Sequence, residues 1–495
     1  MYSRNLEIGI VSLITLLGIS LRLLLWDTQA IPGIDGTTYI RLARSLAGEP
    51  GFETVHQYGF PALIWVAHLF TSDWILAGRI MPMVFGVLLI PVTFLLARRV
   101  TGSFLLALFP TVAVAFMALP LRYSLTTMTE TPYQVFLMLF FLGVYLRRYL
   151  AGGVAAGIAY TIRPEVLLIT GVVALLHWKS KRAAGLILLG AVLVATPYVI
   201  TMGVTQGKWT LSGKGINFGH SDWRANETPV GAEAVETGAL SRLSEHGGDI
   251  ARAYPGRAVR VGEQLLRNGG WVVPVVALFG VTAGSALLLA GLVPIFILPA
   301  IFVGERTRFV FPYLPFLWIL AAVALGRVRK PPLRFGLAAL LIAGLGVSAY
   351  TERHQYTMNE DNPLPETVRT GKWMANFVQP DDVIYDRKPY AAFYAGGQPR
   401  TIPSGSYEGI LNEITTRGGD YLVLNDAIVR AFRPELLPLV TSRTMVLGEH
   451  RLVPIFHEVS ERGLRTIVFR IVRPGGPPPM RGEERIRESL YLLPP

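Results

Sequence analysis

Two carboxylates stand where polar sequence meets long apolar stretches, and their oxygens are of the kind that binds metal ions. Asp35 opens a helical pattern over residues 34–43, just after the first apolar stretch. Glu130 is the only acidic residue of a polar patch at residues 126–132, which precedes another apolar stretch. If both lie at the outer membrane face, they can converge to hold Mg²⁺ or Mn²⁺ through hard oxygen ligands, with phosphate oxygens completing the shell.

A purely structural role explains each carboxylate equally well from the residues alone. Asp35 can cap the helix that begins at about Gly36, because helix N-termini favour a side-chain oxygen that accepts a backbone N–H. Glu130 can complement the dipole of the helix that follows it. Both explanations stay open at this point.

Basic residues on segments predicted to lie outside the membrane favour an anionic ligand. Arginine presents a planar fork that matches phosphate, and basic residues on the outer side run against the usual charge bias of membrane proteins. The alternative is pairing with lipid headgroups or with Glu165 and Glu305, which contributes little. The candidates are Arg163 beside a proline, Lys208 and Lys214 in a long loop, and Arg306 and Arg308.

The composition predicts that helices crossing a membrane position these residues. Of 495 residues, 51% are hydrophobic and only 16% are charged, well below the roughly 25% charge of soluble domains. About eleven apolar segments recur, several of them shorter than the ~20 residues of a perpendicular span. They lie near 6–26, 75–97, 103–119, 132–147, 151–162, 165–178, 184–202, 271–288, 290–303, 309–325 and 334–350.

Short basic clusters beside the apolar segments predict the orientation. The clusters are at 98–99, 147–148, 179–182 and 327–330, and the positive-inside rule places such clusters in the cytoplasm. One orientation satisfies all four, with a cytoplasmic N-terminus and with 27–74, 120–131, 163–165, 203–270, 304–308 and everything after 350 outside. Because the net charge of +12 arises largely from such clusters, we expect a lipid bilayer as the partner and no nucleic acid.

The pattern changes after residue 350. Short strand-like runs at 383–385, 421–424 and 466–469 alternate with helical stretches, which is typical of a small α/β domain. We therefore expect a transmembrane domain at 1–350, with outer loops 27–74 and 203–270, and an extracytoplasmic soluble α/β domain at 351–495. The Pro- and Gly-rich end beyond Arg473 is expected to be partly disordered.

Several stretches in this order resemble the GT-C superfamily of membrane glycosyltransferases, in particular protein O-mannosyltransferases and lipid A aminoarabinose transferases. The resemblance covers roughly residues 1–350. It rests on the order and topology of four stretches, which are IDGTTYIRLA at 34–43, GFPALIW at 59–65, AGRIMP at 77–82 and RTRFVFP at 306–312.

The resemblance implies roles for individual residues. The acid of the first outer loop is catalytic in that superfamily, which implies Asp35 as the base, and a second acid that assists the site or its metal maps to Glu130. Relatives of the aminoarabinose transferases often carry a lysine before a double proline where this chain has QYGFP at 57–61, so phosphate contact is expected from Arg163, Lys214 or Arg308 instead. The complete predicted substrate-binding set is Tyr39, Tyr58, Arg163, Lys214, Arg306 and Arg308.

The function implied is inverting transfer of a sugar from a polyprenyl-phosphate donor to an acceptor in the cell envelope, by a multi-pass enzyme of the plasma membrane. The alternative from another class is a non-enzymatic transporter of a lipid or solute, whose broken helices line a translocation path. The position of the carboxylates at the predicted outer edge, and not within apolar segments, favours the enzyme.

Overall fold

The computed structural model describes residues 4–27, 32–49, 57–206, 209, 211, 239–301, 307–353, 365–403, 405–441, 445–447, 450–459 and 463–473. Three predicted basic positions, Lys208, Lys214 and Arg306, and the end of the chain after Arg473 lie outside the described residues. The chain divides into a helical unit, with residues 1–49, 53–220 and 234–360, and a second unit with residues 50–52, 221–233 and 361–495.

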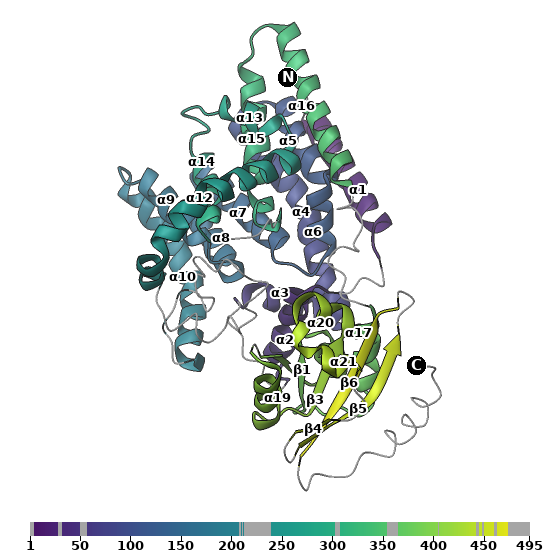
Figure 1. Ribbon diagram of the computed structural model, residues 1–495. Coiled ribbons are helices and arrows are strands. Elements are labelled where there is room, and N and C mark those ends of the chain that lie inside the picture. Colours follow the sequence, from purple (N-terminus) through teal and green to yellow (C-terminus); the bar gives the residue numbers. More distant parts are fainter. Residues whose placement is uncertain are drawn as a thin grey trace. The chain divides into compact units, whose positions relative to one another are not determined.

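The helical unit is a bundle of helices of very unequal length (Figure 1). In chain order its elements are α1 (Arg4–Leu24), α2 (Ile34–Leu46), α3 (Gly59–His68), α4 (Trp74–Thr101), α5 (Phe104–Phe116), α6 (Ala118–Leu125), α7 (Glu130–Tyr145), α8 (Tyr149–Ile162), α9 (Val166–Leu176), α10 (Lys181–Gln206), α12 (Ala239–Gly269), α13 (Val273–Leu278), α14 (Leu288–Ile301), the 3₁₀ turns η1 (Thr307–Phe309) and η2 (Phe311–Tyr313), α15 (Leu314–Arg327) and α16 (Pro331–Thr351).

Five of the described helices are long and apolar enough to cross a membrane, or six if α5 and α6, which meet at a bend of 50°, form one span. The predicted count of about eleven is not confirmed. Several predicted segments form helices of 10–17 residues, shorter than the ~20 residues of a perpendicular span. The segment predicted at 271–288 instead forms α13 followed by turns.

Burial along the long helices distinguishes the centre of the bundle from its periphery. In the apolar part of the span at Thr307–Arg327, which includes α15, 83% of the residues are buried. The corresponding share is 11% in α1 and 17% in α16. A helix that is apolar on all sides belongs in the interior of a bundle or in lipid. Trp318 of α15 is fully buried, and its Nε1 donates to the carbonyl of Gly269 at 2.8 Å, which ties α15 to the end of α12.

Arg22 in the last turn of α1 is a fully buried cation inside this bundle. Its Nε donates to Ser124 Oγ at 2.9 Å, and its Nη1 donates to the carbonyls of Gly18 at 3.0 Å and Ala115 at 3.2 Å. Ala115 lies in the last turn of α5, just before the bend into α6. Since helix ends leave carbonyls without intrahelical partners, Arg22 supplies a donor where water is absent.

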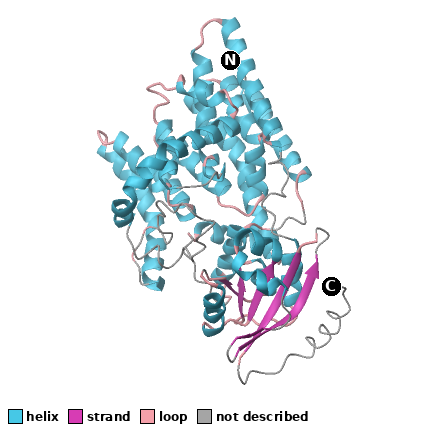
Figure 2. Cartoon of the chain, in the orientation of Figure 1, coloured by secondary structure: helices cyan, strands magenta, loops and turns pink. Residues whose placement is uncertain are grey.

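The second unit contains a six-stranded sheet, which confirms the predicted strands after residue 350 (Figure 2). The strand order is β2-β1-β3-β6-β5-β4, with β2, β1 and β3 parallel and the remaining pairs antiparallel. Apolar clusters cover both faces of the sheet. The elements are α17 (Pro365–Met374), β1 (Val383–Asp386), α18 (Tyr390–Ala395), β2 (Gln398–Thr401), α19 (Tyr407–Thr416), β3 (Tyr421–Asn425), α20 (Asp426–Phe432), η5 (Pro434–Leu436), α21 (Leu437–Thr441), β4 (Met445–Leu447), β5 (His450–Val459) and β6 (Arg465–Val472).

Replacing Arg22 with leucine is expected to destabilise the helical unit. The substitution leaves the Ala115 carbonyl buried without a donor, which costs ~1–3 kcal/mol, while removal of a desolvated charge offsets part of this loss. We expect a net loss of about 1 kcal/mol, measured as a lower midpoint of thermal unfolding of the purified protein in detergent. Leu17→Ala is the control, because Leu17 lies on the same helix and is 50% exposed. Equal midpoints for the two variants would contradict this role of Arg22.

Candidate functional site

Asp35 lies at the start of α2 and forms an ion pair with a residue far away in the sequence. The N-cap position of α2 is occupied by Gly33, so Asp35 is not the N-cap residue. Its Oδ2 accepts a hydrogen bond of 2.6 Å from Nη1 of Arg308 in η1, 273 residues later. The capping role considered for Asp35 is therefore wrong, and two of the predicted site residues are in direct contact.

Glu130 forms the second ion pair of the site. It begins α7 and is 2% exposed. Its Oε1 accepts a hydrogen bond of 2.9 Å from Nη1 of Arg163, which lies at the break between α8 and α9. Arg163 also donates to Glu165 Oε1, from Nε at 2.9 Å and from Nη2 at 2.7 Å. The pairing with Glu165 expected as an alternative is thus present, together with a contact to the predicted second acid.

Phe309 connects the two ion pairs. The guanidinium of Arg308 lies 4.7 Å from the centre of its ring, and that of Arg163 lies 5.6 Å from the same centre. Tyr39 of α2 is buried close to both ion pairs. Its pKa is raised by burial and by the negative charges of Asp35 and Glu130, and the positive charges of the two arginines oppose this shift. Four charged side chains from α2, α7, the α8–α9 break and η1 therefore surround one region.

Glycine allows α2 to approach the polar patch that precedes Glu130. A Cβ atom at Gly36, the residue after Asp35, would lie 2.9 Å from the carbonyl oxygen of Thr127. On the other side of this turn, Gly78 of α4 faces Thr127 Cγ2, which a Cβ atom would approach to 3.0 Å. Side chains at these positions would push α2 and α4 away from the turn, so the small residues set the spacing between Asp35 and Glu130.

Tyr58 immediately precedes α3 and is half-buried. Its ring centre lies 5.8 Å from that of Tyr198 on α10. The following residue, Gly59, packs so closely on Thr161 that a Cβ atom would lie 2.6 Å from the Thr161 carbonyl oxygen. Thr161 is two residues before Arg163, so this packing places Tyr58 close to the end of α8 that precedes Arg163.

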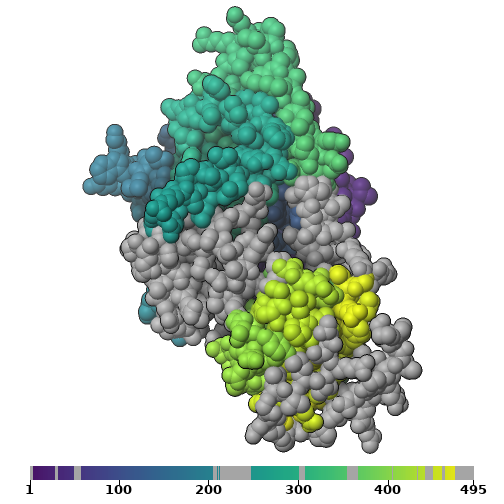
Figure 3. Space-filling view, in the orientation of Figure 1, coloured from purple at the N-terminus to yellow at the C-terminus, as the bar shows by residue number. Residues whose placement is uncertain are grey.

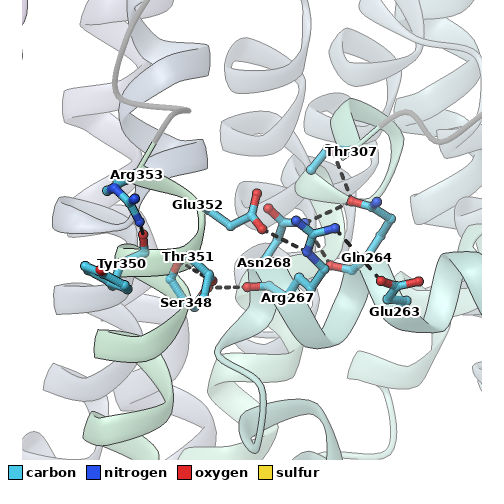
Figure 4. Close-up of polar contacts among 10 residues, drawn as sticks. All are labelled: Glu263, Gln264, Arg267, Asn268, Thr307, Ser348, Tyr350, Thr351, Glu352 and Arg353. Atoms are coloured by element: carbon cyan, nitrogen blue, oxygen red, sulfur yellow. Dashed lines mark hydrogen bonds and ion pairs between the residues drawn. The ribbon is translucent and has the colours of Figure 1, made fainter.

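A polar network holds the residue next to Arg308 in place (Figure 4). Thr307 Oγ1 donates to Gln264 Oε1 at 3.0 Å, and Asn268 Nδ2 donates to the same oxygen at 3.1 Å. One turn away on α12, Arg267 Nε donates to Glu352 Oε1 at 3.0 Å, and the Arg267 carbonyl accepts from Ser348 Oγ of α16. Helix α12, the teal helix across the face of the bundle in Figures 1 and 3, thus anchors η1 and hence Arg308.

Sequence reasoning missed the residues of this network and Arg22. It treated 239–269 as part of an outer loop, although Gln264 and Asn268 are four residues apart and lie on one face of a helix. Arg22 lies well inside the first apolar stretch, whose other charged residue, Glu7, stands at its start. An ionisable residue inside such a stretch is by itself a signal of a functional or structural role.

The donor atoms fit a divalent cation in part. Among the described residues, no three His, Asp or Glu side chains lie together as a metal-binding group. Glu130 Oε2, however, is buried and has no hydrogen-bond partner in the described part of the chain. Such an orphaned hard oxygen is a suitable ligand atom, and the rest of the shell would come from Asp35 and from phosphate or water oxygens.

At the level of sequence, no protein-family model and no curated protein matches this chain. Solved structures do match it. ArnT from Cupriavidus metallidurans bound to undecaprenyl phosphate aligns over 93% of this chain and 98% of its own, with a TM-score of 0.59 at 12% identity. The chain has the GT-C fold. The archaeal oligosaccharyltransferase AglB from Archaeoglobus fulgidus matches in two complexes, both at 14% identity. The complex with an inhibitory peptide and a dolichol-phosphate covers 96% of this chain and 75% of its own with a TM-score of 0.53, and the complex with Zn and sulfate covers 95% and 74% with 0.57. At these identities the likeness concerns the fold.

The contact between α2 and the turn before Glu130 can be tested with Gly36→Ala. Alanine normally stabilises a helix by roughly 0.5–1 kcal/mol relative to glycine. Here its Cβ would lie 2.9 Å from the Thr127 carbonyl oxygen, and such overpacking costs about 1–3 kcal/mol, so we expect a lower midpoint of thermal unfolding. Gly171→Ala is the matched control, because Gly171 also lies inside a helix, α9, and nothing lies within 4 Å of a Cβ atom there. A Gly36→Ala variant as stable as the control would show that α2 and the turn are further apart.

Proposed function

We propose that the chain is an inverting glycosyltransferase that moves a sugar from a polyprenyl-phosphate carrier to an acceptor in the cell envelope. The observation that carries the proposal is the pairing of Asp35 with Arg308 beside the pair of Glu130 with Arg163. A base for the acceptor and cations for a phosphate are what this transfer needs. The GT-C fold supports it, since ArnT and AglB were each crystallised with a polyprenyl phosphate.

In this proposal the pair of Asp35 with Arg308 is the reactive one, because it is the more accessible. The side chains of Asp35 and Arg308 are 25% and 20% exposed, whereas those of Glu130 and Arg163 are 2% and 10% exposed. A carboxylate paired with a guanidinium is a weak base. When the donor phosphate binds Arg308, it competes with Asp35 for the guanidinium and leaves the carboxylate free to accept a proton.

The proposed transfer is a single displacement. Asp35 takes the proton of the acceptor hydroxyl, and the hydroxyl oxygen forms a bond to the anomeric carbon of the sugar. The bond from that carbon to the phosphate oxygen breaks on the opposite face, and its electron pair leaves with the polyprenyl phosphate. Arg308 and Arg163 stabilise the charge that grows on the leaving phosphate, which is most effective in a site poor in water.

A divalent cation fits this arrangement as an additional ligand of the phosphate. Glu130 Oε2 and Asp35 would hold it, and it would supply positive charge at the leaving group. The described cluster has three acids, Asp35, Glu130 and Glu165, and two arginines, Arg163 and Arg308. The cluster therefore has one uncompensated negative charge, and the donor phosphate adds to it, which favours a cation when the donor is bound.

The proposed orientation places the site outside the cytoplasm. Helix α7 begins with Glu130 at the site and ends at Tyr145, directly before the basic pair at 147–148. The basic pair at 98–99 likewise lies at the end of α4, whose first half packs on the turn before Glu130. Since basic clusters favour the cytoplasmic side, the opposite ends of both helices face outward. We further propose that 1–350 is the catalytic domain and that the α/β domain at 351–495 is extracytoplasmic and takes part in binding the acceptor.

Asp35→Asn should abolish transfer without unfolding the protein. A positioned general base contributes typically ~10²–10⁴-fold to the rate, so we expect activity to fall by at least about 100-fold. The measurement incubates purified protein with a panel of radiolabelled polyprenyl-phosphate sugars and crude envelope acceptors. The matched control is Asp73→Asn, because Asp73 also begins a helix after an outer loop, where its Oδ1 caps α4 through the N–H groups of Ile75 and Leu76, and asparagine caps equally well.

Near-normal transfer by Asp35→Asn, with Asp73→Asn as the reference, would contradict the assignment of the base. Movement of labelled lipid across vesicles by the wild-type protein, without transfer of sugar to any acceptor, would instead indicate a transporter.

Metal dependence is tested with Glu130→Gln. If Glu130 Oε2 is a ligand, chelation with EDTA stops transfer, Mn²⁺ or Mg²⁺ restores it, and the variant needs at least about ten-fold more metal for half-maximal activity, since even changes around the ligands of metal sites cost ~10–100-fold. The control is Glu165→Gln, which removes the other acidic partner of Arg163 but not the orphaned oxygen. Equal metal requirements in both variants would assign the effect to Arg163, and full activity in EDTA would exclude a required metal.

A further inference from the structure

A groove of about 470 Å³ opens between α4 and α7 at the ends of these helices that lie away from the candidate site. Helix α7 carries Glu130 at its start and has 16 residues, so the groove lies about 24 Å from that residue along the helix axis. The groove is separate from the cluster of Asp35 and Glu130. It is lined by Leu95, Arg98, Arg99, Gly102, Leu142 and Leu146.

One arginine of the groove has unused hydrogen-bond donors. Arg98 is held by Glu7 of α1, with Nη2 3.2 Å from Glu7 Oε1, and it also donates to the Gly102 carbonyl. Arg99 donates only from Nε, to the Tyr145 carbonyl at 3.3 Å, and within the described ranges its Nη1 and Nη2 have no hydrogen-bond or ion-pair partner. Arg99 is exposed, so its terminal nitrogens are available to an anion.

More positive charge lies at the rim of the groove. Arg147 and Arg148 directly follow the lining residue Leu146 and are both exposed. With Arg98 and Arg99 they make four cations at one end of two adjacent helices, and Arg98 is paired with the carboxylate of Glu7. A ligand for this end of the groove must therefore carry negative charge.

The other side of the groove is apolar and open. Leu95 is 51% exposed and Leu146 is 45% exposed. Leu95 lies on α4, and Leu146 directly follows α7, so both are close in sequence to the arginines. A ligand that satisfies the whole groove is therefore an anion attached to an apolar chain.

We propose that this groove binds one anionic glycerophospholipid of the bilayer. Its phosphate contacts Arg99 and Arg98, and its acyl chains lie along Leu95, Leu142 and Leu146. The volume of about 470 Å³ is in the range of small-molecule pockets. Anionic lipids are concentrated in the cytoplasmic leaflet, and basic pockets between membrane helices on that side bind their headgroups. The lipid would fix α4 and α7, the two helices that lead to the candidate site, but it is not a substrate.

The test uses the full-length protein purified in detergent and native mass spectrometry. Phosphatidylglycerol and phosphatidylcholine with the same acyl chains are titrated in parallel, and inorganic phosphate is a third ligand. Phosphatidylglycerol should bind several-fold more tightly than phosphatidylcholine, and Arg99→Gln should weaken its binding about five-fold, which is the contribution of one arginine near an anionic lipid. Arg99 is chosen because replacing Arg98 would also break its pair with Glu7.

The matched control is Arg329→Gln, which removes an exposed arginine of another basic cluster outside the groove and should leave both affinities unchanged. Equal affinity for the two phospholipids would overturn the proposal. An equal effect of Arg99→Gln and Arg329→Gln would also overturn it. Inorganic phosphate that binds with the same dependence on Arg99 and displaces phosphatidylglycerol would show a site for a free anion instead of a lipid. Thermal unfolding of each variant verifies that it is folded.

Discussion

The ion pair of Asp35 with Arg308 is the interaction around which the candidate site is arranged. Its members are 273 residues apart and come from α2 and η1. A partly buried carboxylate without a partner is unfavourable, so the pair favours contact between the two segments. A hydrogen bond from Thr307 to Gln264 links η1 to α12. The ion pair of Arg267 with Glu352 links α12 to the end of α16. The position of one guanidinium therefore depends on four separate segments.

Breaks in the apolar helices are the place of further polar contacts in the bundle. A break frees backbone carbonyls and changes the direction of the chain, and inside a membrane protein these carbonyls need donors. Arg22 donates to a carbonyl at the bend between α5 and α6, and α6 leads to the turn before Glu130. Arg163 follows the end of α8 and reaches Glu130 on the neighbouring helix. Broken helices and buried arginines therefore occur together, and both lead to the site.

That these charged residues share one region was the part of the site that sequence could predict. Asp35, Glu130, Arg163 and Arg308 were assigned to one face because the basic clusters and the order of apolar segments determine which loops share a face, and the structure brings these four together. Which acid meets which arginine was not predictable, because the partners are joined through packing and not through sequence spacing. The predicted number of spans is not confirmed for a related reason. A helix of 14 residues such as α8 is apolar enough to count but too short to cross alone.

Asp35 and Glu130 are each paired with an arginine in this arrangement, and this bears directly on how such a site can react. In the proposed reaction, Asp35 is held by Arg308 until the donor phosphate competes for the same guanidinium. The deeper pair cannot exchange in this way, because Glu130 is 2% exposed and Arg163 has a second acidic partner in Glu165. In the proposed reaction, Glu130 and Arg163 therefore stay paired while they assist the phosphate, and Asp35 and Arg308 separate when the substrate binds. In the proposed reaction, binding of the donor and activation of the base are consequently one event, which ties proton transfer to the presence of the lipid-linked sugar.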